Sequence, residues 1–151
     1  MRSAYGAKEN GIGQHPATII VDVANVMGSR PDGWWRDRAG AAVRLHAEIA
    51  ALAARGRPVL PGDTEPEEFV MVLEGATKAA RIAAAQNNAQ DDSVRVVRAD
   101  GSGDDAIVAL VRELPGRRAV VTADRELRRR CEAAGAEVFG PSWLMGLLGQ
   151  R

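Results

Sequence analysis

The stretch Thr18–Val23, with the sequence TIIVDV, is a short run of apolar and β-branched residues that contains one acid. Such a run is typical of a strand buried on both faces, as in the centre of a parallel sheet. Asp22 lies near its end, where a buried carboxylate destabilises the fold unless it is paired or binds a cation. The stretch therefore predicts a central strand with a functional acid at its carboxyl end.

Further strands and helices alternate along the rest of the chain. The other strands are predicted at residues 69–73, 93–98, 119–122 and 137–139, and the helices at about 34–55, 75–89, 104–114, 124–134 and 141–148. This alternation predicts an α/β fold, a single doubly wound three-layer domain with a mostly parallel sheet of four or five strands. With Thr18–Val23 central, the expected strand order is 3-2-1-4-5, and the domain spans residues 17–151.

Composition narrows the class of protein. A chain of 151 residues with 46% hydrophobic residues is expected to form one domain with a full core. A formal net charge of zero excludes a strongly basic stripe for duplex DNA, but it leaves room for RNA on a local patch. With one cysteine and two histidines, neither a disulfide framework nor a zinc site is expected, which suits a cytoplasmic protein.

The distribution of apolar residues bears on membrane insertion and on secretion. No run approaches the roughly 18 apolar residues of a membrane-spanning helix, so no membrane segment is expected. Residues 1–16 are polar and contain no apolar stretch, so they do not resemble a signal peptide. We expect them to be a flexible N-terminal tail.

Acidic residues stand at the ends of the predicted strands or at the start of the helix that follows. They are Asp22, Glu74, Asp104, Asp105 and Asp124. In an open parallel sheet the carboxyl ends of the strands meet at one edge, where ligands bind. Carboxylates gathered there repel each other unless a cation joins them, and they are ligands that Mg²⁺ and Mn²⁺ prefer. The pattern therefore predicts a divalent metal site, and with it phosphate chemistry.

The same acids lie within a series of short motifs. From about Ala17 to Leu148 the chain resembles the PIN-like nucleases and, within them, the NYN group. The matching elements are VDVAN at Val21–Asn25, GDDAI at Gly103–Ile107, VTADREL at Val121–Leu127, and the closing GAEV at Gly135–Val138 with SWL at Ser142–Leu144. Each motif is short, and their specificity comes from the order in which all of them occur.

The resemblance implies metal-dependent RNA cleavage by a small doubly wound domain. The resemblance also implies that the metal ligands are Asp22, Asp104 or Asp105, and Asp124. It implies that Asn25 orients a ligand or the substrate. Glu74 stands where many relatives have Asp, so its role as a ligand, directly or through water, is left open. Asp124 has a structural alternative as well, because Asp is a favoured helix N-cap.

Residues that contact the substrate are expected near the same edge of the sheet. Trp34 lies among arginines in the segment GSRPDGWWR (Gly28–Arg36), and aromatic rings beside arginine can stack bases. Arg30, Arg36 and Arg125 are candidates for phosphate contacts. The alternative for the tryptophans is packing against the core.

The sequence thus predicts an Mg²⁺- or Mn²⁺-dependent endoribonuclease that cleaves single-stranded or loop RNA. Two alternatives stay open. One is a non-catalytic domain of the same fold that binds RNA or a protein partner. The other is a nucleotide phosphohydrolase in which Asp22 is the nucleophile. The sequence does not specify which RNA is the substrate or whether the substrate is DNA, and the formation of a homodimer is left open.

Overall fold

A computed structural model describes residues 17–56, 58–62, 66, 68–79 and 94–149. The predicted N-terminal tail and most of the helix expected at residues 75–89 lie outside the described residues. None of the described helices is long and apolar enough to cross a membrane.

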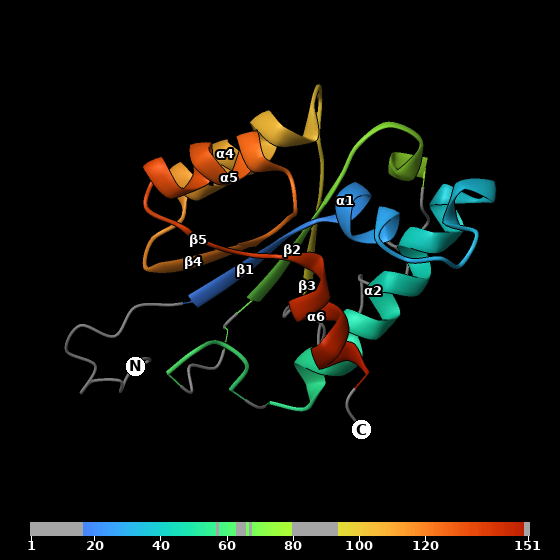
Figure 1. Cartoon of the computed structure of the whole chain (residues 1–151), viewed down its shortest axis with the longest axis horizontal. Helices are drawn as coiled ribbons and strands as arrows, with labels where there is room; N and C mark the ends of the chain where they lie inside the picture. Colours follow the sequence, from blue (N-terminus) through green and yellow to red (C-terminus); the bar gives the residue numbers. More distant parts are fainter. Residues whose placement is uncertain (1–16, 57, 63–65, 67, 80–93, 150–151) are drawn as a thin grey trace.

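A five-stranded parallel sheet forms the centre of the molecule (Figure 1). Its strands are β1 (Ala17–Asp22), β2 (Glu68–Leu73), β3 (Val94–Arg98), β4 (Arg117–Val121) and β5 (Glu137–Phe139). Their order is β3-β2-β1-β4-β5, which confirms the predicted order 3-2-1-4-5. All six residues of β1 are buried, as expected for a central strand. The order changes direction beside β1, and this places a switch point between β1 and β4.

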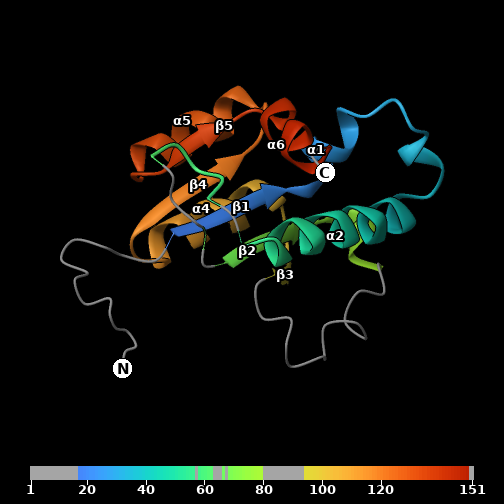
Figure 2. The ribbon, with the colours of Figure 1, turned by 90° about the horizontal axis from the view of Figure 1, so that it is seen from below.

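Helices cover both faces of the sheet (Figures 1 and 2). The elements are α1 (Val23–Gly28), η1 (Trp34–Arg36), α2 (Arg38–Ala54), η2 (Gly75–Ala79), α4 (Gly103–Glu113), α5 (Arg125–Ala133) and α6 (Pro141–Leu148). Side chains alternate along β1: Ile19 and Val21 pack into the core with α1, α2 and α6, whereas Ile20 packs into the core with α4 and α5. The domain is therefore a three-layer α/β fold, as predicted.

The segment between β1 and α2 differs from the expectation in two ways. A short helix, α1, begins directly after Asp22, and its buried residues Val23, Val26 and Met27 have helical spacing. The predicted helix at about 34–55 is divided at Asp37, whose non-helical backbone separates η1 from α2. The Asp37 side chain caps α2 by accepting a hydrogen bond of 2.9 Å from the Gly40 N–H.

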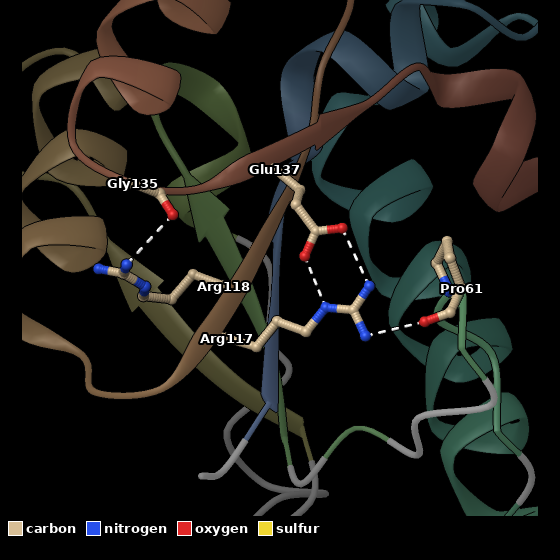
Figure 3. A network of polar contacts seen from close by, with 5 residues as sticks. All are labelled: Pro61, Arg117, Arg118, Gly135 and Glu137. Carbon is tan, nitrogen blue, oxygen red and sulfur yellow. Dashed lines mark hydrogen bonds and ion pairs between the residues drawn. The ribbon is translucent and has the colours of Figure 1, made fainter. Parts of the chain in front are cut away.

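The amino-terminal edge of the sheet carries a structural ion pair (Figure 3). Arg117, the first residue of β4, donates to both carboxylate oxygens of Glu137, the first residue of β5, over 2.5 and 3.0 Å. Its guanidinium also donates to the Pro61 carbonyl at 2.8 Å, and the neighbouring Arg118 donates to the Gly135 carbonyl. The ion pair lowers the pKa of Glu137. This edge lies opposite the acids, so these contacts hold the strands together without involving the carboxyl edge.

Candidate functional site

Asp22 is the buried acid of the carboxyl edge. It ends β1 and is only 9% exposed. Its Oδ2 accepts a hydrogen bond of 2.9 Å from the Thr122 hydroxyl, which follows β4. Burial raises the pKa of Asp22 from 3.8 to about 6, against the lowering effect of the Thr122 bond. The backbone N–H of Asn25 also lowers this pKa, although the Asp22 side chain makes no capping hydrogen bond to α1. Repulsion from Asp104 and Glu74 adds to the rise.

Asp104 lies in the first turn of α4. That helix begins here because the Ser102 hydroxyl caps it, accepting a hydrogen bond of 3.1 Å from the Asp105 N–H. The pKa of Asp104 is raised by burial first and then by the charges of Asp124 and Glu74. The charge of Glu74 thus acts on both Asp22 and Asp104, and the charge of Asp124 acts on Asp104.

Glu74 connects the end of β2 to the start of α4. Its Oε1 accepts a very short hydrogen bond from the Gly103 N–H, and a Cβ atom at Gly103 would stand only 2.7 Å from that oxygen. Glycine at this position thus permits the close approach of the two segments. The Glu74 backbone is held by Thr77, whose hydroxyl lies 3.0 Å from the Glu74 N–H and 2.6 Å from its carbonyl oxygen.

Asp124 has the structural role that the sequence left open. Its Oδ1 accepts a hydrogen bond of 2.9 Å from the Leu127 N–H and so caps α5. Its own N–H donates to the Thr122 hydroxyl at 3.1 Å. The cap is not its only effect, because the charge of Asp124 raises the pKa of Asp104.

Asn25 links the two loops that flank the switch point. Its Oδ1 accepts a hydrogen bond of 2.7 Å from the Ala123 N–H, between Thr122 and Asp124. The side chain therefore ties the start of α1 to the loop after β4 and fixes the spacing of Asp22 and Asp124.

Asp105 and its neighbour Asp104 have different surroundings. The Asp105 side chain is 74% exposed and pairs with Arg130 of α5 at 3.0 Å. Arg130 also lowers the pKa of Asp104, so it is a cation beside the acids. The two preceding arginines pair within α5 instead, Arg128 with Glu132 and Arg129 with Glu126.

The donor set at this edge fits a hard divalent cation. It consists of the carboxylates of Asp22, Glu74, Asp104 and Asp124, without thiolate or imidazole groups. Within the described residues, no three acidic, histidine or cysteine side chains already stand in the arrangement of a metal cage. Asp124 and Glu74 each have one carboxylate oxygen in a hydrogen bond to a backbone N–H. Rotation of these side chains would therefore accompany metal binding.

The candidate substrate residues have different surroundings. Arg30 is partly buried, pairs with Glu48 at 2.8 Å and donates to the Met145 sulfur, so structural contacts engage it. Arg36 is exposed and lies over the ring of Trp35, with its Cζ atom 5.7 Å from the ring centroid. Arg125 is exposed at the start of α5.

The two adjacent tryptophans differ in how far they are buried. Trp35 is 53% exposed, whereas Trp34 is partly buried and packs against the core. Trp34 also lines a cavity of about 260 Å³, which we call the Trp34 cavity. The other lining residues are Ala24, Met27, Arg38, Glu74, Gly75, Thr77 and Gly101. Sequence reasoning missed Arg38 and Thr77, because nothing in their local pattern indicates that two distant segments meet here.

The fold and the acids together define a doubly wound α/β domain with a carboxylate-rich edge at its switch point. No protein-family model and no curated protein matches the sequence. Among solved structures, a mutant form of Rae1 (YacP) from Bacillus subtilis is similar, with a TM-score of 0.59 and 16% sequence identity. The match covers 87% of this chain and 73% of that chain. At this identity the similarity shows a shared α/β fold.

Proposed function

We propose that this protein is a metal-dependent endoribonuclease that cleaves phosphodiester bonds in single-stranded or loop RNA. The observation that carries the proposal is the burial of Asp22 at the switch point, within electrostatic range of Asp104 and Glu74. Repulsion among three acids destabilises the fold unless another interaction offsets it. A bound cation would relieve that repulsion. The resemblance of the motifs to NYN nucleases points in the same direction.

In this proposal, Asp22, Asp104 and Asp124 hold Mg²⁺ or Mn²⁺, and Glu74 contributes directly or through water. When bound, such an ion lowers the pKa of a coordinated water and stabilises charge on the phosphate. Hydrolysis joins the oxygen of water to phosphorus and breaks the bond from phosphorus to a ribose oxygen. Because Asp105 pairs with Arg130, we assign the ligand role on α4 to Asp104.

The remaining residues position these groups. Thr122 orients the Asp22 carboxylate through its hydroxyl, and Asn25 holds the loop that carries Asp124. Arg125 and Arg36 are exposed and can contact phosphates that flank the cleaved bond. The contacts of Arg30 with Glu48 and Met145 favour a structural role for that residue. With a net charge of zero, the affinity for RNA should depend only weakly on salt.

One observation favours the alternative of a non-catalytic RNA-binding domain. In the described part of the chain the acids do not form a ready-made metal cage. Cleavage of a labelled RNA separates the two functions, assayed with Mn²⁺, with chelator, and with Asp22→Asn. The nuclease proposal requires cleavage that disappears in both controls. Equal cleavage in all three reactions would indicate a contaminant, and RNA binding without any cleavage would establish the alternative.

A further inference from the structure

The Trp34 cavity lies beside the acidic edge, but the proposed reaction does not use it. Four segments meet around it: α1, the stretch from η1 into the start of α2, the loop after β2 that leads into η2, and the loop after β3 at Gly101. Figure 1 shows α1 and the light-green η2 near the same end of the sheet. A cavity of about 260 Å³ is somewhat smaller than the roughly 300–1,000 Å³ that drug-sized ligands occupy. Its size therefore suits one small planar ring system.

The walls of the cavity have the chemistry of a base-stacking site. The Arg38 guanidinium lies over Trp34, with its Cζ atom 5.2 Å from the ring centroid. Aromatic rings and guanidinium planes both stack on the faces of unpaired nucleobases. Trp34 is also held by the core, so its ring is fixed before any ligand binds. Such preorganisation reduces the entropy lost on binding.

Glu74 joins this cavity to the acids. It lines the cavity, and its charge also raises the pKa of both Asp22 and Asp104. A base in the cavity would therefore belong to a nucleotide next to the phosphate at the acidic edge. An ionised carboxylate only accepts hydrogen bonds, so it favours an edge that presents an amino group. Adenine and cytosine present one, as does guanine, whereas the carbonyl oxygens on both sides of the uracil N–H would be repelled.

We propose that the Trp34 cavity binds one unpaired nucleobase beside the cleaved phosphate, and that Glu74 makes it prefer adenine or cytosine over uracil. The inference rests on the proposed function, because it takes the strand at the acidic edge to be RNA. It adds a base preference that the acids alone do not provide.

The test measures binding in the absence of metal, so that it does not depend on cleavage. Fluorescence anisotropy with labelled hexamers of adenosine, cytidine and uridine, in chelator, should show at least fivefold tighter binding of the first two. Glu74→Gln should reduce this preference, since an amide both donates and accepts hydrogen bonds. Equal affinity for all three hexamers in the wild type would overturn the proposal, as would the absence of measurable binding.

Two further variants test the cavity itself. Arg38→Ala removes a stacking partner, and Gly101→Leu fills space, because a Cβ atom at Gly101 meets nothing within 4 Å. Each should weaken binding of the adenosine hexamer about tenfold. The matched control is Arg44→Ala, which removes the same charge from an exposed position on α2 outside the cavity. Equal losses in Arg38→Ala and Arg44→Ala would indicate a general charge effect and overturn the proposal. A Gly101→Leu variant that binds as tightly as the wild type would overturn it as well.

The outcomes separate this inference from the proposed nuclease activity. Selective, Arg38-dependent binding without cleavage in Mn²⁺ would support the cavity and overturn the nuclease. Metal-dependent cleavage together with binding that ignores both the base and the cavity variants would support the nuclease and overturn the cavity.

Discussion

The Thr122 hydroxyl donates a hydrogen bond of 2.9 Å to the buried carboxylate of Asp22, joining residues that lie 100 positions apart. The same hydroxyl oxygen accepts the Asp124 N–H at 3.1 Å. One side chain thus fixes the acid at the end of β1 and the backbone of the acid after β4, on the two sides of the switch point. We expect the positions of both acids to depend on it.

Replacing Thr122 tests this dependence. Thr122→Val keeps the shape of the side chain but removes the donor to a charged, buried group, which should lower the free energy of unfolding at pH 8 by about 2 kcal/mol. It should also raise the pKa of Asp22 further, so the acid limb of the pH–rate profile should move to higher pH. Thr122→Ser should restore both, as measured by denaturant titration and cleavage rates. A Val variant that matches the wild type in both would contradict the role.

The raised pKa of Asp22 gives a prediction about stability. A carboxyl whose pKa rises from 3.8 to about 6 on folding binds its proton more tightly in the folded state. The stability of the metal-free protein should therefore fall as the pH increases from about 4 to about 6, and stay lower above that range. Asp22→Asn removes this ionisation and should stabilise the metal-free protein at pH 8 by up to roughly 3 kcal/mol.

The matched control for this variant is Asp100→Asn, which neutralises an exposed acid in the loop after β3. Its effect on stability serves as the reference for the removal of one exposed negative charge. Denaturant titrations of the wild type and both variants at pH 4 and pH 8, in chelator, make the comparison. If Asp22→Asn is equally or less stable than the wild type at pH 8, the carboxylate is not destabilised by its surroundings.

The sequence predicted most of the architecture, because β1 and the strands around it follow strong local patterns. The apolar run with Asp22 at its end identified the central strand, and the parallel arrangement then placed Glu74, Asp104 and Asp124 at the same edge. What it could not predict depends on contacts between distant segments. The Thr122–Asp22 bond and the pairing of Asp105 with Arg130 join residues whose own neighbourhoods give no sign of each other.

Local backbone detail was also beyond the sequence patterns. The six-residue helix α1 is too short for its apolar spacing to stand out from the strand before it. The next helix is divided because Asp37 caps α2. In the sequence, Asp37 cannot be distinguished from an ordinary polar position of an amphipathic helix. Because η1 separates from α2, Trp34 faces a cavity that a continuous helix would not have suggested.

Metal binding should be visible as thermal stabilisation. A ligand that binds only the folded state at about 100 times its Kd adds about 2.7 kcal/mol, so saturating Mn²⁺ should raise the Tm by several degrees. The effect should weaken below about pH 6, since a proton on Asp22 competes with the ion. Asp22→Asn and Asp104→Asn should abolish the shift, whereas Asp105→Asn should retain most of it. Scanning calorimetry with Mn²⁺ and with Ca²⁺ makes the measurement, and an unchanged Tm at millimolar Mn²⁺ would remove the basis for the metal site.

The two roles of Asp124 can be separated by a pair of substitutions. Asn is as good an N-cap as Asp, so Asp124→Asn should keep the hydrogen bond to the Leu127 N–H and leave the metal-free protein at least as stable. Asp124→Ala removes the cap and should lower the free energy of unfolding by about 1 kcal/mol. If Asp124 holds the metal, both variants should lose orders of magnitude in cleavage rate with Mn²⁺, although only Ala impairs folding. If Asp124 is only a cap, Asp124→Asn should cleave at the wild-type rate. Measuring unfolding in chelator and cleavage in Mn²⁺ on the same preparations distinguishes these cases.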